Sequence, residues 1–591
     1  MTTSLPSLVR FDNVVDGVAT VLSQPVAVIE TYEISDVTRV LGEVEAAVRT
    51  GRYAAGFVTY EAAAAFPDGF RLAQPVGSAG LPLAWFALYD PATVVTTSTT
   101  VSVVDTIEEG TWTPDVDQPT YEQRVRMALE EVAAGVLYQV NLTTPLRRRG
   151  PIDLFTLYQS MVATQAPRYG MFIETPRWGI ASASPELFFD WDGSHLRVRP
   201  MKGTAARGRY AAEDVVAAHT LRSSEKEIAE NVMIVDLMRN DLGRVARTGS
   251  VCVDELCALE AYPGVWQLVS DVVADTCDDV GLVEIFSALF PCGSVTGAPK
   301  SSAMTVIERL EGQPRGIYCG ALGLLSPRES GLRATFSVGI RTAQCDRETD
   351  LVRYGSGGGI VADSDPTAEY EEMLLKARVV QTPPHSFSLF ETFRAGASNG
   401  HDHVKRHLER LTRSAEQFNF TLPRDLESSV QAFVNQLTLE QRVKLTLARD
   451  GTVRWDLGDV PRPRDVVRLC LDDDPVNSAD FRLFHKTTQR EVYESRRARW
   501  ADVDDVVLIN ERGECTETSV ANIAALVEGQ WCTPPLSSGL LPGIQRAFLL
   551  AEGTVVERVL FADDLRTATA LMVFNSLRGT EPARLTDGSR Q

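Results

Sequence analysis

Hydrophobic positions at helical spacing mark the clearest element of the chain, a helix over about residues 224–244. Its apolar side chains recur every three or four positions, which places them on one helix face; they are Ile228, Val232, Val235, Met238 and Leu242. Shorter apolar runs at 187–189, 320–325 and 334–340 are typical of strands. Strands and helices alternate irregularly, without the regular period of a parallel sheet, so the pattern predicts a mixed α+β architecture.

The helical pattern ending at 376–380 is interrupted by Pro383 and Pro384. This break predicts a first domain at 1–380, a linker at 381–386 and a second, smaller domain at 387–591. The length of 591 residues fits two to four domains of ordinary size. Hydrophobic and charged contents of 44% and 23% are typical of a folded globular protein.

Net charge and cysteine content indicate which kinds of binding partner and which cellular location are expected for the chain. A net charge of −21 argues against nucleic acid or an anionic membrane as a partner, and no apolar run is long enough to span a membrane. The N-terminus lacks the pattern of a signal peptide. Nine scattered cysteines without a Cys-x-x-Cys pair favour a reducing, cytoplasmic location. His401, His403 and His407 allow a metal site, but a polar stretch entering a helix explains them better.

Two pairs of glutamates stand at helical spacing and are candidate metal ligands. Glu227 and Glu230 lie three apart on the first helix, so they share one face. Glu369 and Glu372 repeat this spacing on a helix that begins after Asp365 with a proline at its first position. Carboxylate oxygens suit Mg²⁺. Solvated helix faces are the alternative for both pairs.

Candidate groups for binding a small anion surround these pairs in the sequence. The glycine-rich stretch 355–359 can offer backbone N–H groups to a carboxylate, and Arg341 a bidentate contact. Tyr318 can add a hydroxyl. Lys202, directly before Gly203 and Thr204, can act as a nucleophile if its amine is neutral. A surface arginine, a core tyrosine and a surface lysine are the plainer alternatives.

Together these segments resemble the chorismate-utilising enzymes over residues 120–380, and more loosely at 56–61. The motifs occur in the family's order: 184–186, 201–204, 230–243, 293–300, 318–320 and 357–364. Within this family, a lysine at the position of Lys202 resembles aminodeoxychorismate synthase component I. Anthranilate and isochorismate synthases typically carry alanine there.

This resemblance implies a role for each matched residue. Lys202 would attack C2 of chorismate, while Glu186 protonates the leaving C4 hydroxyl. The four glutamates Glu227, Glu230, Glu369 and Glu372 would surround Mg²⁺. Ammonia would then displace the lysine and give 4-amino-4-deoxychorismate. The substrate contacts implied are Gly203, Thr204, Ser294, Tyr318, Arg341, Gly357 and Gly359.

Two glutamines agree with an amine-forming enzyme. Gln139 stands where isochorismate and salicylate synthases carry a water-activating lysine, and Gln267 where anthranilate synthases carry a histidine. Glutamine has no acid–base capacity. Cys292 replaces a glycine that is common in the family, a change that we expect to be harmless. Because no glutaminase nucleophile segment is found, a separate amidotransferase subunit is expected to supply ammonia.

Residues 387–591 resemble the fold-type IV pyridoxal-phosphate enzymes, which include aminodeoxychorismate lyase and aminotransferases. The resemblance rests on the segments 390–394, 407–411, 517–522, 539–546 and 575–579, together with Lys486. It implies that Lys486 forms a Schiff base with pyridoxal phosphate and that Glu517 pairs with the ring nitrogen. The implied phosphate contacts are Arg410, Gly543, Ile544 and Ser576. The first hairpin common in this fold is missing.

The two resemblances predict one chain that aminates chorismate and then releases pyruvate to give 4-aminobenzoate, on the branch to folate. One alternative is an anthranilate synthase component carrying an unrelated aminotransferase. Another is a synthase whose C-terminal part only binds the glutaminase. Lys202 and Gln267 argue against the first, and the intact set of Lys486, Arg410 and Glu517 against the second.

Overall fold

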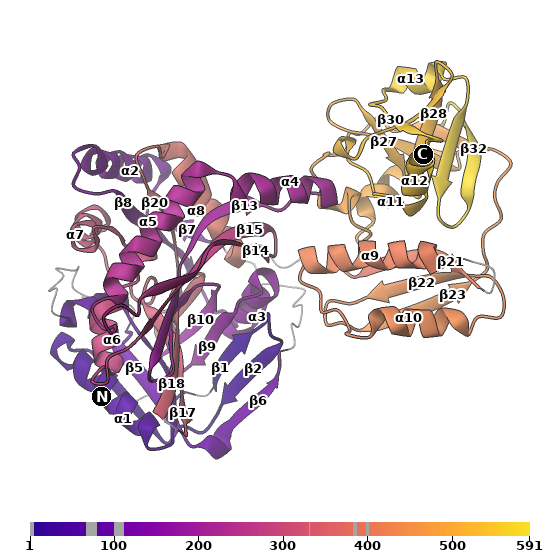
Figure 1. Cartoon of the computed structure of the whole chain (residues 1–591). Coiled ribbons are helices and arrows are strands. Elements are labelled where there is room, and N and C mark those ends of the chain that lie inside the picture. The colour runs from indigo at the N-terminus through magenta and orange to yellow at the C-terminus, as the bar shows by residue number, and fades with distance from the viewer. Residues whose placement is uncertain are drawn as a thin grey trace. The chain divides into compact units, whose positions relative to one another are not determined.

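The computed structural model describes residues 5–6, 8–66, 80–99, 111–329, 331–381, 387–396 and 401–590. The chain forms two compact units (Figure 1). The first contains Met1–Ala206 and Ala218–His385, and the second contains Arg207–Ala217 and Ser386–Gln591. Most of the expected linker, 382–386, lies outside the described residues.

Two antiparallel sheets form the centre of the first unit. The first runs in the order β16 (Gly297–Ala298), β8 (Gln139–Arg149), β20 (Leu351–Ile360), β19 (Thr342–Asp346), β10 (Trp178–Ser184), β9 (Tyr169–Glu174), β1 (Leu8–Asn13), β2 (Val18–Leu22) and β6 (Val94–Ser98), with β7 (Thr113–Pro114) beside β8. The second runs β13 (Met201–Ala206), β15 (Val265–Asp275), β12 (His195–Arg199), β11 (Leu187–Trp191), β18 (Gly331–Val338), β17 (Ala321–Arg328), β4 (Tyr53–Val58), β5 (Ala84–Tyr89) and β3 (Ala27–Thr31), with β14 (Cys252–Tyr262) beside β15.

The two sheets pack face to face through a buried aromatic cluster. Trp178 of the first sheet meets Phe57 and Trp85 of the second edge-on, with ring centroids 5.4 and 5.2 Å apart. Such edge-to-face contacts join two layers that are otherwise held by aliphatic side chains. The mixed α+β architecture expected from the sequence is therefore confirmed.

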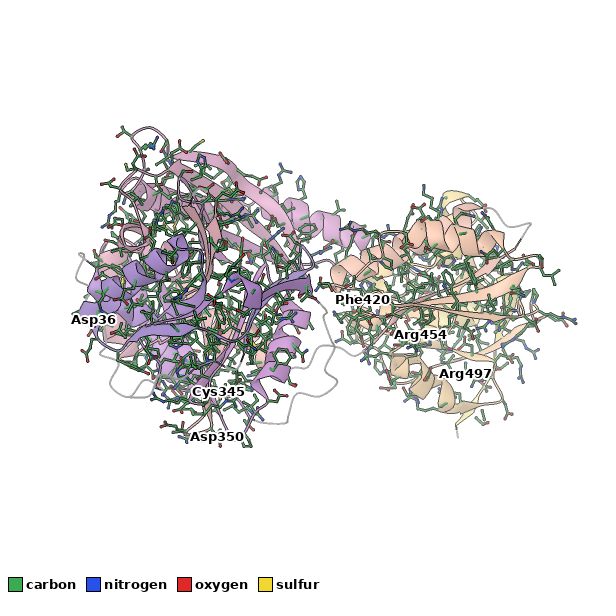
Figure 2. All side chains as sticks on the ribbon, turned by 90° about the horizontal axis from the view of Figure 1, so that it is seen from below. Asp36, Cys345, Asp350, Phe420, Arg454 and Arg497 are labelled. Atoms are coloured by element: carbon green, nitrogen blue, oxygen red, sulfur yellow. The ribbon has the colours of Figure 1, made fainter. Side chains whose placement is uncertain are left out.

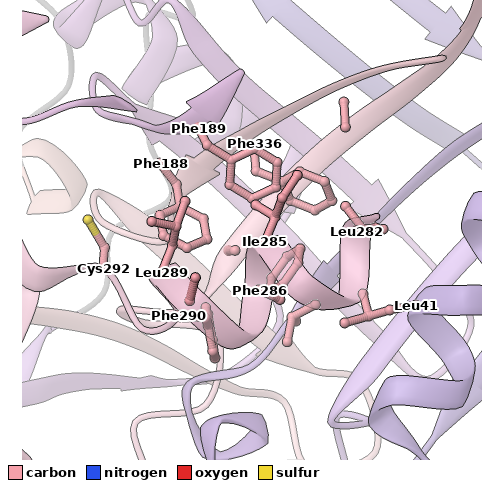
Figure 3. Close-up of a cluster of buried hydrophobic side chains, with 14 of the residues drawn as sticks. Leu41, Phe188, Phe189, Leu282, Ile285, Phe286, Leu289, Phe290, Cys292 and Phe336 are labelled. Carbon is pink, nitrogen blue, oxygen red and sulfur yellow. The ribbon is translucent and has the colours of Figure 1, made fainter. Parts of the chain in front are cut away.

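Helices cover the outer face of each sheet. On the first sheet, buried side chains belong to α2 (Gln118–Ala133), α3 (Leu154–Gln165), α7 (Lys300–Glu311) and α8 (Pro366–Gln381). On the second, they belong to α1 (Val37–Arg49), α5 (Glu225–Leu242) and α6 (Leu282–Leu289). Figure 3 shows Ile285 and Phe286 of α6 among Phe188, Phe189 and Phe336, with Cys292 at the edge of the cluster.

The second unit contains a small sheet with two helices and a larger mixed sheet. The small sheet runs β21 (Leu389–Ala395), β22 (Gln441–Leu447) and β23 (Val453–Gly458), and it packs with α9 (His401–Gln417) and α10 (Leu426–Asn435). Phe420 belongs to this cluster, and Figure 2 draws the side chains of the unit.

The larger sheet of the second unit is partly parallel, at β24–β26, β24–β32 and β29–β30. It runs β27 (Cys515–Thr518), β26 (Asp505–Ile509), β24 (Val467–Leu471), β32 (Gly579–Leu585), β31 (Leu571–Asn575), β28 (Asn522–Val527), β29 (Gln530–Thr533) and β30 (Val556–Glu557). The remaining elements are α4 (Ala211–Arg222), α11 (Glu491–Ala498), α12 (Ile544–Ala551), α13 (Ala562–Thr567), β25 (Trp500–Ala501) and β33 (Ser589–Arg590). Among the described residues, no helix is long and apolar enough to cross a membrane.

Candidate active sites

The first unit contains a cavity of about 480 Å³, and the candidate site residues of this unit line it. It is lined by every one of the expected catalytic, substrate and metal residues of this unit, which are Glu186, Lys202, Gly203, Thr204, Glu227, Glu230, Ser294, Tyr318, Arg341, Gly357, Gly359, Glu369 and Glu372. Positions far apart in the chain, from Glu186 to Glu372, therefore contribute to one concave surface, since strands of both sheets and the helices α5 and α8 reach it.

Both glutamate pairs stand at the beginnings of capped helices. Ser224 precedes α5 and its hydroxyl accepts a hydrogen bond from the Glu227 amide at 3.4 Å. Asp365 precedes α8 and accepts from the Ala368 amide at 2.9 Å. Serine and aspartate favour such N-terminal positions because their oxygens satisfy free helix amides. The caps fix the first turns, and the glutamates of both helices face the cavity.

Lys202 is held by its main chain, which leaves its amine in the cavity. Asn231 of α5 donates its amide to the Lys202 carbonyl at 3.0 Å and accepts from Ser270 at 2.6 Å. The Lys202 Nζ atom lies 3.8 Å from Glu230 Oε2. A Cβ atom added to Gly359 would lie 2.8 Å from that same Nζ, so a larger residue there would displace the end of the Lys202 side chain.

Glu186 is a buried carboxyl group beside Ser294. The Ser294 hydroxyl donates to Glu186 Oε1 at 2.5 Å. Burial raises the pKa of Glu186 to about 7, although the Ser294 hydrogen bond and the Lys202 charge act in the opposite direction. The Glu186 carboxyl group therefore keeps its proton up to a higher pH than the carboxyl group of an exposed glutamate does, which suits a general acid near neutral pH.

Arg341 and Tyr318 lie at strained or tightly packed positions. Arg341 has φ of 51°, in the left-handed region that is unfavourable for arginine, and donates to the Lys376 carbonyl at 2.6 Å. Tyr318 is half-buried, and this burial raises its pKa well above the usual value. A Cβ atom at Gly355 would lie 2.1 Å from the Tyr318 ring. These constraints fix both side chains at the cavity wall.

The glycine-rich stretch 355–359 is a strand in the structure. Residues 355–359 belong to β20 and pair with β8, with Gly357 opposite Thr143 and Gly359 opposite Asn141. A Cβ atom at Gly357 would lie 2.2 Å from the Leu142 carbonyl, so side chains are excluded by close strand packing. The sequence did not distinguish a glycine strand from a glycine loop, because both lack a hydrophobic pattern.

The carboxylates are oxygen ligands of the kind that Mg²⁺ prefers, but they are not already arranged around one point. Among the described residues, no three His, Cys, Asp or Glu side chains converge as metal ligands. Burial raises the pKa of Glu227 and of Glu369. Mg²⁺ typically binds one or two carboxylates and keeps waters or substrate oxygens, so a site divided between two helices is compatible with it.

Lys376 is a cavity residue that sequence reasoning missed. Its Nζ atom lies 2.6 Å from Glu372 Oε1 and donates to the Gly357 carbonyl at 2.9 Å. Burial, the largest single influence, raises the pKa of Glu372, but the charge and hydrogen bond of Lys376 together with the Lys202 and Arg341 charges give a net lowering. The spacing of four residues from Glu372 was the available signal, because it places both side chains on one helix face.

Gln139 lies beside Lys202 in a fully buried position. Neither its amide oxygen nor its amide nitrogen has a hydrogen-bond partner among the described residues. The same added Cβ atom at Gly359 would lie 2.8 Å from Gln139 Nε2. Gln267 donates to the Thr204 hydroxyl at 2.7 Å. Burying the Gln139 amide without hydrogen-bond partners lowers the stability of the fold, and a polar group bound next to it would reduce this loss.

A second constellation, in the other unit, surrounds Lys486. Lys486 is half-buried, and burial followed by the Arg410 charge lowers the pKa of its amine to about 8. Glu517 is also buried, and burial raises its pKa to about 8. Its oxygens accept hydrogen bonds from Tyr493 at 2.9 Å, Asn522 at 3.1 Å and the Leu541 amide at 3.1 Å. A cation beside Glu517 would favour its ionised form.

Arg410 is oriented by a buried carboxylate. Its Nε and Nη2 atoms donate to Glu391 at 2.8 and 2.7 Å, and Nη1 donates to the Pro542 carbonyl at 2.9 Å. His407 lies 2.6 Å from the same carboxylate through Nδ1, while its Nε2 has no partner among the described residues. The expected metal alternative for the histidines is not supported, since His403 stacks on Phe548 instead.

The remaining expected phosphate contacts lie at element ends. Gly543 precedes α12, and Ile544 is its first residue. The Gly543 amide donates to the Leu541 carbonyl at 2.7 Å, whereas Ile544 stands in the first turn, where helix amides lack partners within the helix. Ser576 follows β31 directly. Arg410 reaches the same helix start through its hydrogen bond to the Pro542 carbonyl. A guanidinium and a helix start are groups that bind phosphate, and Ser576 would add a hydroxyl.

Two family profiles match successive parts of the chain. The profile of the chorismate binding enzymes matches residues 12–382, and that of class IV amino-transferases matches residues 388–585. The first match covers more than half of the chain, and the chain belongs to the chorismate binding enzyme family.

Curated relatives match the first unit at similar identity. Aminodeoxychorismate synthase component 1 of Bacillus subtilis is 37% identical over 272 residues, which are 46% of this chain and 57% of that protein. Anthranilate synthase component 1 of Aquifex aeolicus is 36% identical over 269 residues, or 46% of this chain and 53% of that protein. The chain thus spans about half the length of these relatives. Identity alone does not separate the two activities.

A solved structure supports the fold of the first unit. Anthranilate synthase component I of Streptococcus pneumoniae aligns with a TM-score of 0.53 at 23% identity, covering 62% of this chain and 92% of that one. At this identity the likeness concerns the fold alone. The residues lining the cavity therefore carry the argument about chemistry.

Proposed function

We propose that the chain aminates chorismate at C4 to 4-amino-4-deoxychorismate and then eliminates pyruvate from it to give 4-aminobenzoate. The observation that carries the proposal is Lys202, whose amine stands in the same cavity as the buried acid Glu186 and four glutamates. The relative from Bacillus subtilis is named for the first of these activities. We assign this reaction to residues 1–380 and the elimination to residues 387–591.

In the first reaction, the Lys202 amine forms a bond to C2 while the bond between C4 and its hydroxyl oxygen breaks. Glu186 gives its proton to that oxygen, which leaves as water, and Ser294 keeps the carboxyl group in place at 2.5 Å. Ammonia then bonds to C4, and the bond from C2 to Lys202 breaks and restores the amine. Gln139 cannot act as a base, which disfavours attack by water.

Charge complementarity supports the binding of a dicarboxylate in this cavity. Mg²⁺, when bound by Glu227, Glu230, Glu369 and Glu372, would supply positive charge for the ring carboxylate. Arg341 and Tyr318 would hold the enolpyruvyl carboxylate. Gly203, Thr204, Gly357 and Gly359 would add contacts from β13 and β20.

In the second reaction, pyridoxal phosphate would supply an electron-accepting ring. Lys486 would bind it covalently, Glu517 would pair with its ring nitrogen, and Arg410, Gly543, Ile544 and Ser576 would hold its phosphate. The Lys486 amine, with a pKa of about 8, is partly neutral near pH 7 and can accept a proton from the amine-bearing carbon as pyruvate leaves.

Ammonia would come from a separate amidotransferase subunit, and the product would enter folate synthesis. The name "component 1" of the Bacillus relative supports a multi-component enzyme. The charge of −21 supports the absence of nucleic acid and membrane partners, and the cysteine pattern supports a cytoplasmic location.

The test uses the purified chain with chorismate, Mg²⁺, pyridoxal phosphate and an ammonium salt at alkaline pH. We expect 4-aminobenzoate and pyruvate in equal amounts, identified by mass spectrometry. Glutamine in place of ammonium should give no product, because the chain has no glutaminase segment. Anthranilate or isochorismate as the main product would contradict the assignment of the first reaction.

A further inference from the structure

The small sheet of the second unit has one apolar and one polar face. Its core side, packed with α9 and α10, carries residues such as Leu389, Phe393 and Val443. Because side chains alternate along strands, the intervening residues point to the other face. There Thr392 of β21 stands opposite Lys444 of β22.

This polar face adjoins Lys486 through one aromatic ring. The Phe390 amide donates to the Lys486 carbonyl at 2.9 Å. The Lys444 Nζ atom lies 4.9 Å from the centre of the Phe390 ring, and the Lys486 Nζ atom lies 5.3 Å from it. The two amines are therefore no farther apart than the sum of these distances, which a six-membered ring with groups at opposite ends can span.

Lys444 has no anionic partner within the described parts of the chain. Its neighbour across the strands is Asp456, which instead accepts a hydrogen bond from Arg442 at 2.7 Å. Lys444 is only partly exposed and otherwise contacts the Phe390 ring. A half-buried ammonium without a counter-charge favours the binding of an anion.

A second cation on this face is also incompletely paired. Arg394 donates through Nη2 to the Leu577 carbonyl at 2.7 Å, while its Nη1 lies 3.7 Å from Glu440. Its Nε atom is buried and has no hydrogen-bond partner among the described residues. The face thus presents two incompletely paired cations, and one of them, Lys444, lies close to the lysine that would bind the cofactor.

We propose that this face, formed by Phe390, Thr392, Arg394 and Lys444, binds the carboxylates of the substrate of the second unit, with Lys444 holding one of them. The inference rests on the proposed function, in which the substrate is a cyclic amine with two carboxylates. Phe390 packs against the ring, Thr392 offers a hydroxyl donor next to Lys444, and Lys486 faces the amine-bearing carbon. Lys444 is a specificity determinant, since amines without a carboxylate gain nothing from it.

The test measures ligand binding by the second unit in the full-length protein loaded with pyridoxal phosphate. The probe is chorismate without ammonia, because it carries both carboxylates but no amine to react with the cofactor. Binding is followed through the visible absorbance of the cofactor, which reports on this unit. We expect Lys444→Met to raise the dissociation constant about 10- to 100-fold, the loss that follows removal of a charged hydrogen bond.

Two variants control for charge and folding. Lys405→Met removes the same charge from the exposed surface of α9 and should leave the dissociation constant unchanged. Lys444→Arg keeps the charge and should retain most of the affinity. In lysis assays with aminodeoxychorismate, Lys444→Met should raise KM far more than it lowers kcat, while the visible band of the bound cofactor stays intact.

The outcomes separate this inference from the function on which it rests. If the wild-type protein binds no pyridoxal phosphate, the proposed function of the second unit is wrong and the inference fails with it. If the protein binds the cofactor and Lys444→Met leaves both the dissociation constant and KM unchanged, only the inference is wrong. Equal weakening by Lys405→Met would also contradict it, because the effect would then be one of overall charge.

Discussion

The two units each place one lysine at a candidate catalytic position, but the charges around the two amines differ. Lys202 stands in the cavity, 3.8 Å from Glu230 and facing carboxylates from two helices. Lys486 is half-buried, and the largest influences on its pKa are burial and the Arg410 charge, which lower it, while the Glu391 and Glu517 charges act in the opposite direction. Carboxylates therefore dominate the surroundings of Lys202, whereas Lys486 lies among charges of both signs.

The difference corresponds to the groups that each site would bind. Carboxylates around Lys202 suit a divalent cation that neutralises an anionic substrate. The Arg410 cation near Lys486 suits a phosphate-bearing cofactor, and burial helps to keep the amine partly neutral. The same side chain is therefore suited to attack on a ring carbon in one unit and to cofactor attachment and proton transfer in the other.

The largest expected effect is at Lys202. Lys202→Ala removes the nucleophile, so amination of chorismate should fall by several orders of magnitude, about 10⁴-fold or more. The measurement is formation of aminodeoxychorismate with ammonium as the nitrogen source. Lys405→Ala, on the exposed face of α9, is the matched control. Near-normal amination by Lys202→Ala would show that the lysine is not the nucleophile.

A comparably large but separate effect is expected at Lys486. Lys486→Ala removes both the covalent partner of the cofactor and the proton acceptor, so 4-aminobenzoate formation should stop. Amination should persist, because the cavity of the first unit contains no residue of the second. The variant should be colourless and accumulate aminodeoxychorismate, which an added lyase converts to 4-aminobenzoate. Lysis at the wild-type rate would exclude Lys486 as the catalytic residue.

A moderate effect is expected from neutralising the metal-facing carboxylates. Glu230→Gln and Glu369→Gln should each raise the Mg²⁺ concentration needed for half-maximal amination, by about 10- to 100-fold. Glu225→Gln, an exposed glutamate on the same helix as Glu230, is the control and should change nothing. If the wild-type chain kept full activity after exhaustive chelation, the glutamate pairs would not be metal ligands, and the alternative that they are solvated helix faces would hold.

The smallest effect concerns the pH dependence of amination. Glu186 must be protonated to act as an acid, and its pKa is about 7, so the rate corrected for free NH₃ should fall as pH rises above about 7. The Ser294 hydrogen bond stabilises the charged carboxylate, so Ser294→Ala should raise this pKa, by about one unit. The descending limb of the kcat/KM profile should then move to higher pH. A limb that moves to lower pH, or persists in Glu186→Gln, would assign it to another group.

Much of both candidate sites followed from the sequence because their residues sit in short local patterns. The helix carrying Glu227 followed from its apolar spacing, and the helix carrying Glu369 from Asp365 with its following proline. The mixed α+β class followed from the irregular order of strand and helix patterns. Motifs at fixed spacing pointed to the two families without any knowledge of the fold.

Only the tertiary structure decided which of these residues share a surface and in what state they are held. Residues 355–359 pair with β8 as a strand, and Gly355 and Gly357 have no room for a side chain against the Tyr318 ring and the Leu142 carbonyl, which belong to segments distant in the chain. The raised pKa of Glu186, the lowered pKa of Lys486 and the unpaired Lys444 arise from burial and from neighbours on other elements. Residue identity and local spacing are properties of the sequence, whereas burial and charge environment exist only once distant segments have packed together.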